Sequence, residues 1–262
     1  MPPRERRASA HPWWRVWRHD PRAALRLFCV PYAGGSASIY RPWARRLPSG
    51  VEIYAIELPG RVNRIGHRPF TRLAPLVEDL ANALEPVLDM PFALFGHSLG
   101  ALISFELARH LSRTGRPTPV HLFLSGRRAP QCRATRPPAH QQGDEEFLAT
   151  LKELNGTPPE ILSNTEILEL MLPTLRADFE LSETYRFIED SPLTCPITVF
   201  GGREDEESAG SLLDGWSAHT TGAFTKYLLD GGHFYINWGE ATLCGALGRE
   251  LSRSTETGAR LR

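Results

Sequence analysis

The chain has 262 residues and is 41% hydrophobic, which is enough to bury a substantial core, and we expect one large domain rather than two small ones. Thirty basic side chains balance thirty acidic ones, so no net charge directs the protein toward nucleic acid or a membrane surface. The apolar runs are too short to span a bilayer and no secretory signal opens the chain, so we expect a cytoplasmic protein. We also take the protein to be a monomer, although no sequence feature bears on its oligomeric state.

The first 22 residues are rich in arginine, tryptophan and proline, and we interpret them as a solvated tail. Trp13, Trp14 and Trp17 are the side chains that could hold the later half of this tail against the domain. The predicted organisation is therefore an N-terminal tail at 1–22, a folded domain at 23–255 and a polar C-terminal tail at 256–262.

Short apolar runs in the folded domain predict buried strands. They are Leu25–Val30, Val51–Leu58, Phe92–Phe95, Val120–Ser125, Pro196–Phe200 and Phe224–Leu228. Helical patterns occur at Tyr40–Leu47, Thr71–Leu88, Leu99–Leu111 and Glu240–Leu251. Because strands alternate with helices, the sequence predicts an α/β fold with a mostly parallel, doubly wound sheet. Functional sites in such sheets lie at the carboxyl ends of the strands.

Residues 126–190 interrupt this alternation, and we call them the insertion. They carry only helical patterns, at Asp144–Leu154, Asn164–Leu172 and Leu175–Phe187, separated by turns that contain proline or glycine. We interpret the insertion as a helical lid over the edge of the sheet. Ordinary crossover helices are the alternative.

The sequence Gly96-His97-Ser98-Leu99-Gly100 lies between a predicted strand and a predicted helix. It fits the pattern G-x-S-x-G, in which a strained turn exposes a serine hydroxyl and leaves no room for side chains at the flanking glycines. The pattern alone is weak, but the strand before it and the helix after it are the context that it requires. We therefore predict that Ser98 is a nucleophile at the N-terminus of a helix, with a Gly/Ser turn as the plain alternative.

A serine nucleophile needs a base within hydrogen-bond reach and an acid that orients the base. His233 follows the last predicted strand in Asp230-Gly231-Gly232-His233, and its position after an acid matches the chain order Ser, acid, His. Asp205 follows the strand that ends at Phe200 and is the predicted acid, with the neighbouring glutamates 204, 206 and 207 as a solvated rim. We expect His97 to be a packing residue and His219 to lie on the surface.

Two backbone N–H groups must also face the carbonyl oxygen of the substrate, to stabilise the charge that develops there. One comes from the residue after the nucleophile, Leu99. The other comes from a loop after an early strand, and we nominate Ala33 in Pro31-Tyr32-Ala33-Gly34-Gly35. The glycines of this loop could also suggest a phosphate-binding loop, but the lysine and the spacing of a P-loop are missing.

The cysteines Cys29, Cys132, Cys195 and Cys244 are widely scattered, without a spacing typical of zinc ligands. We therefore expect reduced thiols, with Cys29 and Cys195 buried, and neither a metal nor a cofactor.

The chain from about Leu25 to Leu251 resembles the stand-alone type II thioesterases of polyketide and nonribosomal peptide synthases. The resemblance depends on VPYAGGSASIYRPW, ELPGR, GHSLGA, GGREDE and LLDGGHFYI, which occur in the order of the family together with a helical insertion. It implies an α/β-hydrolase fold with a mobile lid, and hydrolysis of aberrant or stalled acyl groups from the phosphopantetheine thiol of acyl or peptidyl carrier proteins. The catalytic positions of the family fall on Ser98, Asp205 and His233, and its oxyanion donors on Ala33 and Leu99.

Two other functions remain open at this point. A carboxylesterase or lipase could use the same residues with a different acyl pocket, and a hydrolase fold without catalysis could serve as a binding module. Because carrier proteins are usually acidic, arginines near the site could dock them, namely Arg61, Arg64, Arg127 and Arg128. An ordinary solvated surface is the alternative for these side chains.

Overall fold

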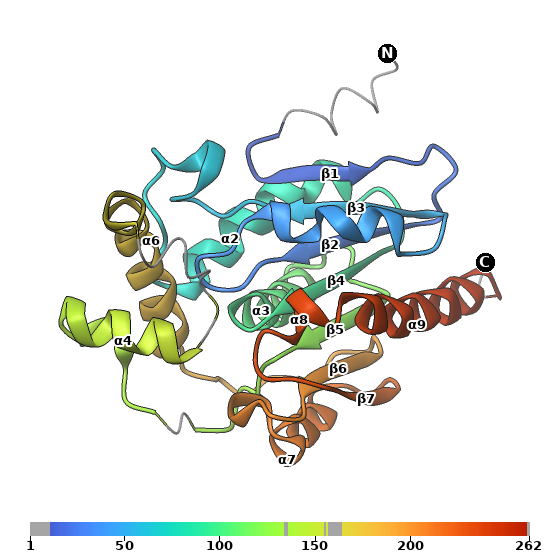
Figure 1. The fold of residues 1–262 in the computed structure, drawn as a ribbon. Coiled ribbons are helices and arrows are strands. Elements are labelled where there is room, and N and C mark those ends of the chain that lie inside the picture. Colours follow the sequence, from blue (N-terminus) through green and yellow to red (C-terminus); the bar gives the residue numbers. More distant parts are fainter. Residues whose placement is uncertain (1–10, 134–135, 155, 157–163, 261–262) are drawn as a thin grey trace.

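A computed structural model describes residues 11–133, 136–154, 156 and 164–260. Within these residues one sheet of seven strands has the order β1-β3-β2-β4-β5-β6-β7 (Figure 1). The parallel strands are β2 (Leu25–Val30), β3 (Val51–Ile56), β4 (Phe92–His97), β5 (His121–Ser125), β6 (Ile197–Gly202) and β7 (Phe224–Leu229). These are the six predicted strands, with ends shifted by a few residues, and the predicted α/β class is confirmed.

The seventh strand corrects the prediction of an N-terminal tail. β1 (Trp14–Arg18) pairs antiparallel with β3, with Trp14 opposite Ile56. Trp14 is 2% exposed, and the Trp17 indole N–H donates a hydrogen bond of 2.8 Å to the carbonyl of Ala37. Trp14 and Val16 pack in the core on one face of the sheet, whereas Trp17 packs in the core on the other face, because successive side chains of a strand point to opposite faces. The tryptophans therefore do hold this segment against the domain, as part of the sheet.

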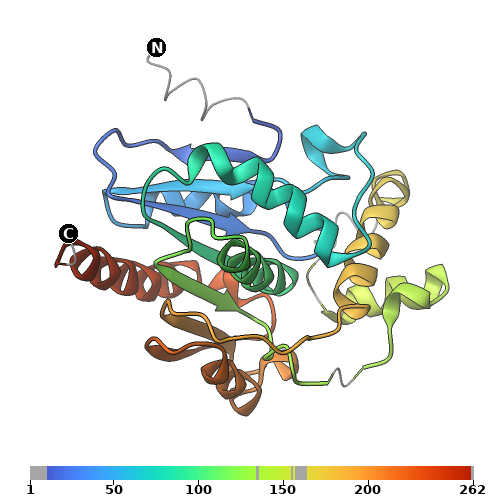
Figure 2. The same cartoon turned by 180° about the vertical axis from the view of Figure 1, so that it is seen from behind.

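Helices cover both faces of the sheet. α2 (Leu73–Leu84) and α3 (Leu99–Arg113) lie on one face, and α9 (Glu240–Arg260) lies on the other (Figures 1 and 2). Alternate residues of β2 point to opposite layers, so Phe28 packs in the core beneath α2 and α3, whereas Cys29 packs in the core beneath α9.

The ends of several helices differ from the predictions. The helix expected at Tyr40–Leu47 is a 3-10 segment at Ala37–Arg45, and the one expected at Thr71–Leu88 ends at Leu84 with a 3-10 turn at Glu85–Val87. α9 continues to Arg260, so the expected C-terminal tail from 256 is largely helical. No proline occurs in residues 240–260 to stop it.

The insertion is helical, as predicted, and its helices α4 (Asp144–Leu154) and α6 (Thr165–Glu183) lie together beyond one end of the sheet (Figure 1). Phe147 of α4 and Leu175 of α6 share a small core that is separate from the two layers at the sheet. The two helices expected at 164–172 and 175–187 are one, because α6 runs through Pro173. Buried Leu168 and Leu175 hold it in place on both sides of this proline.

Shorter elements complete the described chain. They are 3-10 turns at Val62–Arg64, Ala139–Gln141, Glu206–Ser208 and Gly215–His219 and the short helices α7 (Gly210–Asp214) and α8 (Tyr235–Trp238). None of the helices in the described residues is long and apolar enough to cross a bilayer. The four cysteines are free thiols, and Cys29 and Cys195 are buried as expected.

Candidate active site

The turn around Ser98 has the strain that its sequence pattern predicts. β4 ends at His97, α3 begins at Leu99, and Ser98 between them has a φ of 54° and a ψ of −112°. A Cβ atom on Gly96 would lie 2.0 Å from the carbonyl oxygen of Gly100, and one on Gly100 would lie 2.1 Å from the carbonyl oxygen of Val30. Both glycines are therefore required for the close approach of strand and helix, and the turn leaves the Ser98 hydroxyl at the sheet edge.

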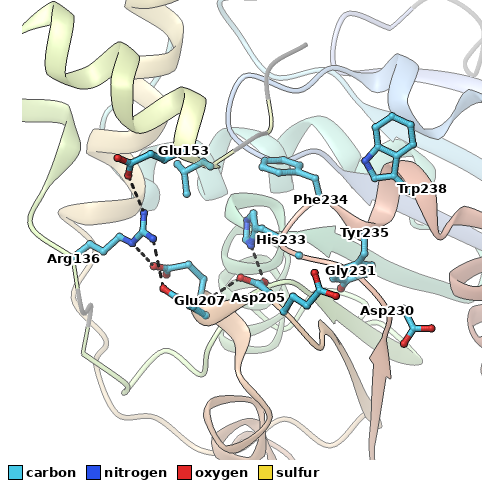
Figure 3. Close-up of a pocket in the computed structure, with 14 residues that line it drawn as sticks. Arg136, Glu153, Asp205, Glu207, Asp230, Gly231, His233, Phe234, Tyr235 and Trp238 are labelled. Carbon is cyan, nitrogen blue, oxygen red and sulfur yellow. Dashed lines mark hydrogen bonds and ion pairs between the residues drawn. The ribbon is translucent and has the colours of Figure 1, made fainter. Parts of the chain in front are cut away.

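Three side chains that are distant in the sequence form one hydrogen-bonded chain at this edge. Nε2 of His233 lies 2.9 Å from Oγ of Ser98, and Nδ1 of His233 lies 2.9 Å from Oδ2 of Asp205. Figure 3 shows the second of these contacts. With a neutral imidazole protonated on Nδ1, the ring donates to the carboxylate and accepts from the hydroxyl, which is the arrangement of a nucleophile, a base and an orienting acid. Asp205 follows β6 and His233 follows β7, as predicted.

Asp205 is held by more than the histidine. The Ser208 hydroxyl donates to Oδ2 at 2.5 Å, and the N–H of Glu207 donates to Oδ1 at 3.0 Å. Burial alone would raise the pKa of Asp205, but the hydrogen bonds from His233, Ser208 and Glu207 outweigh it and hold the pKa below its usual value. Ser208 was missed by the sequence analysis. Asp205 is a residue type that commonly caps a helical turn, and it caps the 3-10 turn Glu206–Ser208. This capping preference is the sequence feature that could have placed Ser208 beside it.

The two proposed backbone donors lie at the same place. Ala33 and Leu99 line one cavity with Ser98 and His233. The loop that carries Ala33 turns at Gly34, which has a φ of 73° and donates its N–H to Oδ2 of Asp178 at 2.7 Å. Asp178 lies on α6, so the insertion helix fixes the residue next to Ala33.

His97 packs behind the turn, as expected. Its Nδ1 lies 2.9 Å from Oγ of Ser125, and that hydroxyl lies 2.5 Å from the hydroxyl of Tyr235. Burial, with the nearby imidazole of His233, lowers the pKa of His97 well below its usual value. The ring is therefore neutral, and it places no second positive charge beside His233.

Two expectations about the surroundings are only partly met. His219 is half-buried rather than a surface residue, because its ring packs against Phe105, Phe187 and Trp216. Glu204 and Glu206 are exposed, as a solvated rim requires, whereas Glu207 is half-buried and forms an ion pair with Arg128.

The expectation that these four arginines form a docking surface is wrong, because each of them is engaged within the protein. Arg61 is buried and forms an ion pair with Asp178 at 2.8 Å, and Arg64 is buried with its guanidinium over the ring of Trp13. Arg128 pairs with Glu207, and Arg127 points inward and donates to Ser182 at 2.8 Å. These arginines hold the active-site loops and line the site instead of forming a free basic surface.

The cavity beside Ser98 has a volume of about 560 Å³ and reaches from the nucleophile to the inner sides of α4 and α6. A second cavity of about 340 Å³ lies on the other side of His233, toward Trp238 (Figure 3). Arg136, Glu153 and Glu207 border both cavities. In the described ranges no group of His, Cys, Asp and Glu side chains has the arrangement of a metal site.

Comparisons with known proteins agree with this architecture. The model of the thioesterase domain family matches residues 25–251. The gramicidin S biosynthesis protein GrsT of Aneurinibacillus migulanus is 44% identical over 229 residues, which is 87% of this chain and 90% of that protein.

Two solved structures of thioesterases have the same fold. The thioesterase RedJ from the prodiginine pathway of Streptomyces coelicolor superposes with a TM-score of 0.82 at 38% identity, covering 87% of this chain and 86% of its own. The type II thioesterase BorB from the borrelidin cluster gives 0.81 at 36% identity, covering 92% and 98%. The sheet order and the strand-turn-helix at Ser98 are those of the α/β-hydrolase fold. With its family model matched over most of its length, this chain belongs to the thioesterase domain family.

Proposed function

We propose that this thioesterase is a type II editing enzyme that hydrolyses aberrant or stalled acyl groups from the phosphopantetheine thiol of acyl or peptidyl carrier proteins. The observation that carries the proposal is the hydrogen-bonded chain from Ser98 through His233 to Asp205 at the mouth of a cavity large enough for an acyl group. The names of the relatives support the setting, because they belong to the biosynthesis of gramicidin S, prodiginine and borrelidin.

In the proposed mechanism, Oγ of Ser98 attacks the thioester carbonyl while Nε2 of His233 takes its proton. Asp205 keeps the other ring nitrogen protonated and stabilises the imidazolium that forms. The N–H groups of Ala33 and Leu99 donate to the oxyanion of the tetrahedral intermediate. The C–S bond then breaks, and His233 returns the proton to the departing phosphopantetheine thiolate. Water attacks the acyl-serine by the same route and releases the free acid, and neither a metal nor a cofactor is needed.

The test uses a carrier protein loaded with an acyl-phosphopantetheine and follows release of the acyl group by intact-protein mass spectrometry. The wild-type enzyme is expected to turn this substrate over much faster than an oxygen ester with the same acyl group. Ser98→Ala should lower kcat by about 10⁴-fold or more, as removal of a serine nucleophile does in other hydrolases. Faster hydrolysis of the oxygen ester would favour a carboxylesterase instead, and carrier binding without turnover would favour a binding module.

A further inference from the structure

The cavity beside Ser98 combines an apolar wall with charged side chains from the insertion. Its apolar lining includes Leu99, Ala129, Ala139 and Phe179. A purely hydrocarbon acyl group would need no more than such a wall. The charged side chains of the lining therefore indicate which polar groups an acyl chain bound in this cavity would carry.

The carboxylates of the lining are already engaged or exposed. Glu183 accepts from the backbone N–H groups of Ala139 at 2.9 Å and His140 at 3.0 Å, and its Oε2 lies 2.5 Å from Nδ1 of His140. Glu207 forms an ion pair with Arg128, and Glu153 lies 3.9 Å from Arg136. Another lining carboxylate, that of Glu146, is on the exposed side of α4.

Arg127 differs from these groups, because its guanidinium contacts no carboxylate within 4.0 Å among the described residues. Its one described side-chain hydrogen bond goes from Nη1 to the neutral hydroxyl of Ser182 at 2.8 Å. A guanidinium has five N–H donors, so several remain for another acceptor. Burial lowers the pKa of Arg127 to about 10, with the neighbouring Arg128 as a further cause, so the group is still charged at neutral pH.

The position of Arg127 relative to the nucleophile is fixed by the sheet. Its backbone follows β5, and Ser98 donates its N–H to the carbonyl of Ser125 at the end of β5, at 2.8 Å. The Arg127 carbonyl accepts from the indole N–H of Trp216 at 2.8 Å. The side chain then extends to Ser182 on α6, so it crosses the space between the sheet and the insertion within the lining of the cavity.

We propose that Arg127 binds an acceptor oxygen on the acyl chain and thereby selects acyl groups that carry a carboxylate or a keto oxygen over hydrocarbon chains of the same size. This inference rests on the proposed function, because it names the class of acyl group that the same site takes. A hydrocarbon chain would displace water from the guanidinium without replacing its hydrogen bonds, whereas an oxygenated chain would replace them.

The experiment compares acyl groups of equal size on one carrier protein. Malonyl, acetoacetyl and isovaleryl have the same number of non-hydrogen atoms and differ in bearing a carboxylate, a ketone or neither. Succinyl, levulinyl and isocaproyl form the same set with one more carbon between the two ends. The measured quantity is kcat/KM of each oxygenated group divided by that of its hydrocarbon counterpart, for the wild type and for Arg127→Met, Arg127→Lys and Arg186→Met.

In Arg127→Met this ratio is expected to fall by about 10- to 100-fold for at least one chain length, the loss typical of a hydrogen bond to a charged group. Arg127→Lys, which keeps the charge, should retain part of the ratio for the carboxylate. Arg186→Met is the matched control, because Arg186 is exposed, lies outside the lining of the cavity and donates to the carbonyls of Glu183 and Tyr185, and it should keep the wild-type ratio. Thermal unfolding reports whether each variant is folded, and Arg127→Gln provides the comparison if Arg127→Met is not.

An unchanged ratio in a folded Arg127 variant would overturn the inference. An equal loss for all acyl groups would also overturn it, since the arginine would then bind the phosphopantetheine arm or act only on the structure. These outcomes are distinct from a failure of the proposed function, in which the wild type would release none of the acyl groups, isovaleryl included. Loss of selectivity for malonyl and succinyl alone would identify the carboxylate as the recognised group, and loss for acetoacetyl and levulinyl would identify the ketone.

Discussion

The ion pair between Asp178 and Arg61 joins the insertion to the loop of the proposed oxyanion hole, and its removal tests this connection. Asp178 is 3% exposed, with one carboxylate oxygen 2.8 Å from Nη2 of Arg61 and the other 2.7 Å from the N–H of Gly34. Arg61 also donates to the carbonyls of Gly35 at 3.0 Å and Pro59 at 3.2 Å. One carboxylate on α6 therefore holds two loops that follow different strands.

Asp178→Ala should lower the free energy of unfolding by about 3–5 kcal/mol, the range found when one partner of a buried ion pair is removed. In this variant Arg61 keeps its two carbonyl acceptors, which reduces the loss of stability caused by its unpaired charge. The N–H of Gly34 is left without its partner, which contributes about 1–3 kcal/mol of the loss. Urea unfolding at neutral pH measures the sum. We also expect kcat to fall more than KM changes, because Gly34 no longer holds Ala33 next to Ser98.

A double variant separates the charge from the packing. If most of the loss arises from an unpaired buried guanidinium, Arg61→Met combined with Asp178→Ala should be more stable than Asp178→Ala alone. A loss below about 1 kcal/mol for Asp178→Ala, or a double variant as unstable as the sum of the single ones, would refute this reasoning.

Three further outcomes follow from individual buried positions. Burial lowers the pKa of His121 to about 4, so stability is complete above its unfolded value of 6.5 and falls as the pH drops below it. His121→Gln should therefore lose about 2 kcal/mol less than the wild type between pH 7 and pH 5 in urea unfolding, with the exposed His67→Gln as its control. Gly126→Ala should lower the free energy of unfolding by about 1–3 kcal/mol, because Gly126 has a φ of 62° and its new Cβ would lie 2.5 Å from Cε1 of His97. Gly66→Ala, whose new Cβ would have nothing within 4 Å, should lower it by less than about 1 kcal/mol. Equal losses of the two variants in thermal unfolding would contradict backbone strain at Gly126. Trp14→Ala should cost about 3–5 kcal/mol if β1 is part of the core, and Trp238→Ala, at a side chain 89% exposed, within about 0.5 kcal/mol; a small loss at Trp14 would argue for a tail after all.

The sequence was sufficient for the centre of the sheet, because strands that are buried on both faces are continuous apolar runs. β2 and β4 have every residue buried, and each was predicted from such a run. β1 was missed because it is short and carries two arginines among its three apolar residues, and these arginines suggested a solvated tail. The helix break expected at Pro173 was wrong because contacts of α6 with the rest of the protein outweigh the local preference of proline.

The catalytic residues could be predicted because their chemistry and their order along the chain constrain them. The side chains whose positions depend on pairing with a residue far away in the sequence could not. Ser98, Asp205 and His233 each follow a strand that could be recognised, so their meeting at one edge could be expected. The pairing of Arg61 with Asp178 spans 117 residues and has no local signal, which is why Arg61 was taken for a docking residue. The inward direction of Arg127 likewise depends on where α6 lies.

The proposed nucleophile can be tested most directly by trapping its acyl intermediate. The enzyme is mixed with a carrier protein bearing an acyl-phosphopantetheine, quenched in acid within a single turnover and digested, and the peptides are weighed. We predict that the mass of the acyl group appears on the peptide with Ser98 in the wild type and on no peptide in Ser98→Ala, which should also lose turnover. Acyl release at the wild-type rate by Ser98→Ala, or an acyl group on a different residue, would contradict the account.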